Sequence, residues 1–300
     1  MNLAILSKGS SNYSTGRLVE EAKAQGHEVR VINYAKCFVT LEQNNPVVHY
    51  RGEIVRGVDA IIPRISAQLT NYGSSIVRQF EMQNVFTTTS SISIVRARDK
   101  LRSMQLLAKS GVGIPKTVFA RETADYEGVL EQVGGAPVII KVARGTHGTG
   151  VVLAETRKAA LAVMQAFNVE GVNFLVQEYV EESKGEDIRV FVVNGKVIAS
   201  MLRKSLDGDF RANLHQGGEG VPIKLSDIER KTAQKAARAI GLTIAGVDML
   251  RSARGPLVLE VNASPGFGIE KVTGRNVAAA IIEYTDHSAR TGRRKDKVGA

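Results

Sequence analysis

Three side chains with oxygen donors lie close together near the end of the sequence. Residues alternate in the stretch 257–262, so Glu260 and Asn262 share one face of a predicted strand whose other face is apolar. Asp248 lies on a preceding apolar segment, and the short connection containing Gly255 predicts that the two segments pair as antiparallel strands. Carboxylate and amide oxygens suit Mg²⁺, which binds few protein carboxylates together with water and substrate phosphates. We therefore expect a metal site here, and a solvent-facing polar strand face is the alternative.

Two lysines stand where a nucleotide phosphate could be bound. Lys100 opens a predicted helix, and Lys141 ends a buried strand just before the glycine-rich stretch 144–150. A cation beside free backbone N–H groups suits phosphate oxygens. The stretch has no Gly-Lys-Ser/Thr and is therefore not a Walker A loop. Lys141 as an ordinary residue at a strand end remains the alternative.

Charged residues also follow one another on a predicted hairpin. Asp187 and Arg189 share a strand face, Arg203 ends the second strand, and Arg211 and Asn213 follow it. Arginines that converge on a metal–phosphate site can neutralise the charge of a transferred phosphoryl group. Each arginine alone is more often half of a surface ion pair. No Ser–His–Asp or Cys–His pairing accompanies them in the sequence.

The first ninety or so residues alternate strands with helices. The stretches 3–6, 28–32 and 58–63 read as strands, and Thr15 is expected to cap the helix after the first of them. This βαβ order predicts a small parallel sheet covered by helices.

Later segments carry clearer local signals. The stretch 99–110 has a helical spacing of apolar residues. The dipeptide Asn194-Gly195 predicts a tight hairpin turn, and Ser226 is expected to cap a long amphipathic helix through residue 240.

Length and composition limit the number of domains, the cellular location and the kinds of partner that are expected. A chain of 300 residues exceeds the usual single domain, so two or three packed units are expected. No apolar run approaches the roughly 20 residues that a membrane span needs, and the N-terminus reads as a strand and not as a leader. The single cysteine, Cys37, excludes an internal disulfide and suits a reducing cytoplasm, the expected location. The net charge of +10 is compatible with nucleic acid or with acidic small molecules and peptides.

The chain resembles the RimK family of ribosomal-protein glutamate ligases, within the ATP-grasp superfamily, as far as residue 284. The most specific stretches are 96–105, 207–218, 245–248 and 260–266. The resemblance implies a mixed α/β and α+β fold. Residues 1–95 would form a parallel pre-ATP-grasp domain, and two subdomains on antiparallel sheets would follow at 96–180, with a glycine-rich flap, and 181–287, with the metal site. A basic flexible tail would occupy 288–300.

The resemblance also assigns roles to residues. Asp248, Glu260 and Asn262 would hold two Mg²⁺ or Mn²⁺ ions, and Arg203 and Arg211 would be catalytic. The residues expected around ATP are Lys100, Lys141, Glu178, Tyr179, Asp187, Arg211, Ala212 and Asn213.

The implied reaction has two steps and two acidic substrates. A carboxylate attacks the γ-phosphorus of ATP to form an acyl phosphate, and an amine then displaces phosphate to form an amide. The acceptor would be the C-terminal tail of a small-subunit ribosomal protein, and the amine would be that of glutamate. The positive charge then attracts acidic substrates, and neither direct nucleic-acid binding nor membrane association is expected. A homo-oligomer is expected, with a tetramer as one form.

Two other functions remain open at this stage. An ATP-grasp γ-glutamyl ligase for a small molecule or an amino-group carrier protein would share the nucleotide site. The loop 262–270 is one residue shorter than the family pattern, and it should border the acceptor or amine pocket. A basic nucleic-acid-binding module is the alternative from another class, and the low aromatic content of 5% disfavours it.

Overall fold

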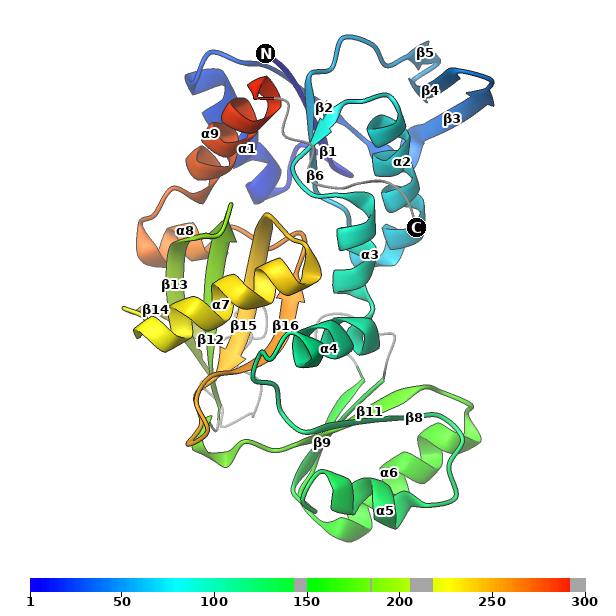
Figure 1. Ribbon diagram of the computed structural model, residues 1–300, viewed down its shortest axis with the longest axis vertical. Helices are drawn as coiled ribbons and strands as arrows, with labels where there is room; N and C mark the ends of the chain where they lie inside the picture. The colour runs from blue at the N-terminus through cyan, green and yellow to red at the C-terminus, as the bar shows by residue number, and fades with distance from the viewer. Residues whose placement is uncertain (143–149, 184, 206–217, 292–300) are drawn as a thin grey trace.

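The computed structural model describes residues 1–142, 150–183, 185–205 and 218–291 of the chain. Three units follow one another along its long axis (Figure 1). The predictions for 144–149, for residues 211–213 and for the tail from 292 lie outside the described residues.

The first unit contains the predicted parallel sheet, with strand order β2-β1-β6-β7. Its elements are β1 (Asn2–Leu6), α1 (Tyr13–Ala24), β2 (Glu28–Ile32), β6 (Ala60–Pro63), α2 (Thr70–Met82), β7 (Phe86–Thr87) and α3 (Ser91–Arg98). The connection from β2 to β6 adds an antiparallel sheet that the βαβ reading did not predict. Its strands are β3 (Cys37–Glu42), β4 (Asn45–Tyr50) and β5 (Glu53–Ile54). Apolar side chains such as Phe38 and Leu41 are exposed on it, so its burial pattern is not that of a core strand.

The predicted helix cap at Thr15 is wrong. Helix α1 begins at Tyr13 after Asn12, and Thr15 lies in its first turn. The Thr15 side chain is buried, and its hydroxyl contacts Ser7 Oγ at 2.9 Å. The hydroxyl therefore joins the helix to the end of β1, a contact that a local capping rule does not consider.

The second unit is a four-stranded antiparallel sheet of order β10-β9-β11-β8. It comprises α4 (Lys100–Lys109), β8 (Thr117–Ala120), α5 (Tyr126–Gln132), β9 (Val138–Val142), β10 (Val151–Ala154), α6 (Arg157–Val169) and β11 (Phe174–Glu178). Helices α5 and α6 pack together beside the sheet (Figure 1). Their apolar side chains form a core of their own with Ile140 and Val176. Helix α4 begins at Lys100, as predicted, because the Asp99 carboxylate caps it by accepting from Arg102 N at 2.9 Å.

The third unit is a five-stranded antiparallel sheet of order β14-β13-β12-β15-β16. Its elements are β12 (Glu186–Val193), β13 (Lys196–Lys204), β14 (Glu219–Pro222), α7 (Asp227–Ile240), β15 (Ile244–Leu250), β16 (Leu257–Asn262), α8 (Gly268–Thr273) and α9 (Val277–Arg290). The predicted hairpin is confirmed, since Asn194 and Gly195 have φ of 49° and 74°, as a tight turn of this type requires. Ser226 caps α7 in a capping box with Glu229, also as predicted.

The first and third units share their apolar cores. One face of the five-stranded sheet, with Ile188 and Val190, belongs to the same core as α7 and α4. The other face, with Phe191, joins Phe267 and apolar residues of β1 and α9. Helix α9 returns to pack beside α1, near the start of the chain (Figure 1). The loop between β16 and α8 is therefore held between the two units. Among the described residues, none of the helices is both long and apolar enough to cross a membrane.

Candidate nucleotide and metal site

The charged residues predicted on the hairpin and on the last strand pair meet on neighbouring strands. Asp187 lies opposite Arg203 in the β12–β13 pair, and Arg189 lies opposite Asp248 in the β12–β15 pair. Asp248 in turn faces Glu260 across β15 and β16. Residues directly opposite each other project from the same face of a sheet. The predicted gathering of Asp248 and Glu260 on one face is thus confirmed.

Arg203 binds two carboxylates in this cluster. Its Nε and Nη2 atoms donate to the two carboxylate oxygens of Asp187 at 2.5 and 2.6 Å, and Nη2 lies 3.0 Å from Asp248 Oδ2. Burial lowers the pKa of Arg203, but the charges of Asp248 and Asp187 outweigh it and the pKa is raised. Arg203 therefore keeps its charge in a site that is almost closed to water. No described residue accepts a hydrogen bond from its Nη1 atom.

Arg189 is the principal partner of Asp248. Its Nη2 donates to Asp248 Oδ2 at 2.6 Å, and its Nε donates to Oδ1. Burial raises the pKa of Asp248, but Arg189 and Arg203 together hold it below its usual value. Asp248 is therefore a carboxylate, although it is only 3% exposed. Strand alternation correctly predicted that Arg189 shares a sheet face with Asp187. Nothing in the sequence indicated that Arg189 binds Asp248.

The donor set fits a hard cation that also binds substrate oxygens. An ionised carboxylate has about four lone-pair positions, and arginine N–H groups use three of those of Asp248. Glu260 is exposed, and its Oε1 accepts from Asn262 Nδ2 at 2.9 Å, which leaves Glu260 Oε2 and Asn262 Oδ1 as ligand atoms. The described residues contain no compact group of three or more His, Cys, Asp or Glu side chains suited to a metal. The few oxygens of Asp248, Glu260 and Asn262 suit Mg²⁺, which takes most of its other ligands from phosphates and water.

The two lysines lie within electrostatic reach of this face. Burial lowers the pKa of Lys141 to about 8, against an opposing effect of Glu260 and with a further decrease from Lys100. Burial also lowers the pKa of Lys100, and Glu260 again opposes it. Lys141 Nζ donates to Gln177 Oε1 at 2.5 Å. The charge of Glu260 thus acts on both lysines, one on β9 and one at the start of α4. Perturbed pKa values of this kind are common at functional sites.

Glu178 and Tyr179, predicted at the adenine, lie at the end of β11. The Glu178 carboxylate accepts from Lys116 N at 2.7 Å and from Arg254. Its backbone N–H donates to Lys116 O at 3.0 Å. These contacts tie β11 to the segment before β8 and to the β15–β16 connection. The side chain and the N–H of Glu178 are therefore committed to the fold, so base recognition would fall to the remaining backbone groups here.

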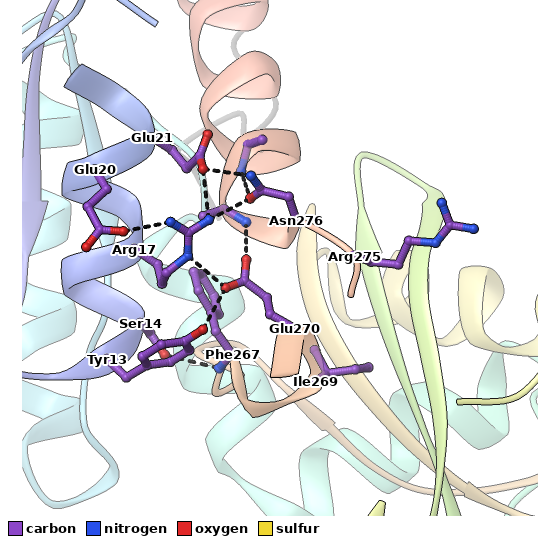
Figure 2. Close-up of polar contacts among 12 residues, drawn as sticks. Tyr13, Ser14, Arg17, Glu20, Glu21, Phe267, Ile269, Glu270, Arg275 and Asn276 are labelled. Atoms are coloured by element: carbon purple, nitrogen blue, oxygen red, sulfur yellow. Dashed lines mark hydrogen bonds and ion pairs between the residues drawn. The ribbon is translucent and has the colours of Figure 1, made fainter. Parts of the chain in front are cut away.

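The loop after β16 is anchored by an ion pair with the first helix (Figure 2). Arg17 Nε donates to Glu270 Oε2 at 3.0 Å, and Phe267 N donates to Ser14 Oγ at 3.1 Å. Glu270 Oε1 accepts from Ala278 N at 3.0 Å, at the start of α9. These contacts fix α8 against α1 and against the start of α9. Nothing in the sequence spacing pointed to the two contacts with α1, because their partners lie 253 residues apart in the chain.

The chain is similar to known proteins over nearly its whole length. Residues 1–94 match the RimK PreATP-grasp domain, and residues 97–285 match the RimK-like ATP-grasp domain. A protein of Vibrio cholerae named as a probable alpha-L-glutamate ligase is 52% identical over 298 residues, 99% of each chain. A protein of Hydrogenovibrio crunogenus with the same name is 52% identical over 97% of each chain.

Solved structures share the fold at low sequence identity. The ATP-grasp ligase PsnB, in a complex with a precursor variant, Mg and ADP, has a TM-score of 0.74 at 19% identity. That similarity covers 95% of this chain and 97% of PsnB. A RimK domain ATP-grasp protein from Sphaerobacter thermophilus has a TM-score of 0.69 at 18% identity, covering 95% and 99%.

Proposed function

The chain belongs to the family of RimK-like ATP-grasp ligases, and on that premise we propose that it adds glutamate to the C-terminus of a small-subunit ribosomal protein. The members of this family are ATP-dependent enzymes that form C–N bonds. Glutamate enters the proposal from the names of relatives that are 52% identical over nearly the whole chain. The ribosomal acceptor rests on the resemblance of the sequence motifs.

One observation carries the proposal. Arg203 is held in place by Asp187 and Asp248, and the charge of Glu260 acts on Arg203 and on the lysines of β9 and α4. Fixed cations around one exposed carboxylate suit a triphosphate whose terminal group is being transferred.

The proposed reaction conserves all its atoms. A carboxylate oxygen of the acceptor attacks the γ-phosphorus of ATP, the bond to the β-phosphate oxygen breaks, and ADP leaves. The amine nitrogen of glutamate then attacks the acyl carbon, phosphate leaves, and the nitrogen loses a proton as the amide forms. Both nucleophiles belong to substrates, so the reaction needs no serine or cysteine of the protein as a nucleophile.

The side chains of the protein bind and orient the substrates. Lys100 and Lys141 would pair with phosphate oxygens, and Arg203, through Nη1, would face the group in transfer. Asp187 would act by fixing the guanidinium plane of Arg203. We include Arg211, Ala212 and Asn213 at the phosphates, and Glu178 and Tyr179 beside the base, as further parts of the proposal.

Asp248, Glu260 and Asn262 would hold Mg²⁺ or Mn²⁺, two ions in our proposal. When bound, the metal neutralises phosphate charge and aligns the oxygens for in-line transfer. We further propose a cytoplasmic enzyme that assembles as a homo-oligomer, such as a tetramer.

The second candidate is a γ-glutamyl ligase acting on a small molecule or an amino-group carrier protein. The short loop between β16 and α8 favours it, because this loop borders the site and differs in length from the pattern expected for the ribosomal-protein enzymes. Both candidates use the same nucleotide site, so the acceptor alone separates them.

The test is phosphate release with Mg-ATP, glutamate and a defined acceptor. We expect release that requires both glutamate and the C-terminal peptide of the ribosomal protein, with mass spectrometry detecting added glutamate residues. Turnover with a small acceptor, and none with the peptide, would replace the ribosomal proposal with the second candidate. Glu260→Gln serves as the inactive control in both assays.

A further inference from the structure

Two arginines beside the loop after β16 have no carboxylate partner among the described residues. Arg64 directly follows β6, and its Nη2 donates to Pro265 O at 2.7 Å. Its guanidinium carbon lies 5.0 Å from the centre of the Phe267 ring. Arg98 ends α3, and its Nη2 donates to Ile65 O at 2.9 Å. Neither side chain forms an ion pair within the described part of the chain.

These two cations are costly to the folded protein as they stand. Burial lowers the pKa of Arg64 to about 10, and the positive charge of Arg98 adds to the decrease. Burial also lowers the pKa of Arg98, with Glu260 and Tyr34 opposing. Both arginines are partly buried, and charges withdrawn from water are normally paired, because desolvation without a counter-charge is unfavourable. Two like charges at such a place attract an anion.

Arg98 and the β16–α8 loop each carry a polar atom without a hydrogen-bond partner among the described residues. Arg98 Nε is closed to water and has no hydrogen-bond partner in the part of the chain that the structure describes. The same holds for Ser264 Oγ, in the loop whose next residue binds Arg64. Arg98 thus reaches the residue that follows Arg64, and Arg64 reaches the β16–α8 loop. A carboxylate, which accepts several charge-assisted hydrogen bonds, would pair with the other N–H groups of both guanidiniums.

The topology of the first sheet supports the position. In the sheet order β2-β1-β6-β7, the strand that follows β1 in the chain, β2, lies on one side of β1, and β6 lies on its other side. The strand order therefore reverses between β1 and β6. In open parallel sheets, ligands bind at such a point, outside the carboxyl ends of the two strands. Arg64 lies at that point, since its N–H donates to Leu6 O at 2.8 Å, at the end of β1.

We propose that Arg64 and Arg98 form a subsite that binds a non-reacting carboxylate of the amine substrate. The inference rests on the proposed function and names the part of the site that receives glutamate. Free glutamate keeps two charged carboxylates throughout the reaction, because only its nitrogen reacts. The reacting carboxylate of the acceptor must instead lie at the γ-phosphate. The bond of Arg64 to Pro265 O, three residues after Asn262, places the subsite beside the proposed metal face, as an attacking amine requires.

The test compares Arg64→Gln and Arg98→Gln with the wild-type enzyme. We expect the KM for glutamate, and its Kd by calorimetry, to rise on the order of tenfold to a hundredfold, as the loss of a charge-assisted hydrogen bond implies. The KM for ATP should stay within about twofold, and Arg64→Lys should recover part of the loss. Arg30→Gln is the matched control, because Arg30 also donates to a backbone carbonyl, Arg56 O, but is exposed on β2. Melting curves with and without Mg-ATP will show that each variant folds.

Substrate analogues identify the carboxylate. Wild-type enzyme should prefer glutamate over glutamine or over the α-amide of glutamate, and the arginine variants should lose one of these preferences. If the KM for the acceptor peptide rises and that for glutamate does not, the carboxylate belongs to the acceptor and our assignment is wrong. Unchanged KM values for both substrates would show that Arg64 and Arg98 do not form a substrate subsite. A wild-type enzyme without glutamate-dependent turnover refutes the proposed function, and the subsite inference with it.

Discussion

Arg17 on α1 and Glu270 on α8 form an ion pair at 3.0 Å between the first helix of the chain and the segment after β16 (Figure 2). Glu270 is 8% exposed, and both of its carboxylate oxygens accept hydrogen bonds from donors: Arg17 and Tyr13 at one, Ala278 N at the other. Asn276, which caps α9, also accepts from Arg17 at 3.2 Å. The pair therefore fixes the β16–α8 loop against the first unit.

Glu270→Gln should destabilise the protein by about 1–3 kcal/mol, because one oxygen becomes an NH₂ group that faces another donor. Glu20→Gln is the matched control, since Glu20 pairs with the same Arg17 but its side chain is 66% exposed. We expect less than about 0.5 kcal/mol for that change. Urea denaturation measures both, and equal midpoints for the two variants would contradict a special role for Glu270.

Glu260→Gln should leave stability unchanged and reduce ATP turnover by about a hundredfold or more. Glu260 is exposed, so the loss of its charge removes little from the fold, while the proposed metal loses an anionic ligand. Glu219→Gln, at an exposed position of β14 in the same sheet, should keep full activity. Full turnover in Glu260→Gln would refute the metal assignment.

Asp248→Asn, unlike Glu260→Gln on the neighbouring strand, should reduce the stability of the protein. Asp248 is buried and binds two arginines, so neutralising it leaves uncompensated positive charge in the interior. A loss of about 3 kcal/mol is expected, together with loss of activity. Thermal unfolding of the two variants side by side tests this contrast, which fails if both melt at the wild-type temperature.

ATP binding should weaken as the pH rises through about 8. The folded pKa of Lys141, about 8, lies below its ordinary value of 10.5, so the folded protein releases this proton first. The free energy of unfolding therefore increases with pH between about 8 and 10.5, as the cost of burying the charged lysine is relieved. Over the same interval Lys141 loses the charge that phosphate requires. We expect the Kd for Mg-ATP to increase by up to about tenfold per pH unit above 8.

Lys141→Arg should flatten this pH profile, because a guanidinium stays charged throughout the range. Isothermal titration from pH 7 to 9.5, at constant free Mg²⁺, measures the slope. The same slope in both proteins would mean that Lys141 does not govern the pH dependence.

Much of the framework follows from neighbouring residues in the sequence. The turn at Asn194-Gly195, the cap at Ser226 and the facing of Asp248 and Glu260 were all predictable, since each depends on backbone preferences or strand alternation over a few residues. Family membership was equally accessible, because the motifs occur in order along most of the chain. Local rules failed at Thr15, where a contact with the end of β1 overrides capping.

The partners of the charged groups required the folded chain. The bonds of Arg189 to Asp248 and of Arg17 to Glu270 depend on segments far apart in sequence that pack together. The same is true of Arg64, which contacts Pro265 and has no carboxylate partner in the described part of the chain. Whether an arginine is an exposed charge, half of an ion pair or an unpaired cation is set by burial and by the groups that surround it in space. Residue types and spacing identified which chemistry the chain carries. The packing of α1, α8 and the five-stranded sheet determines which of these charged groups lie together.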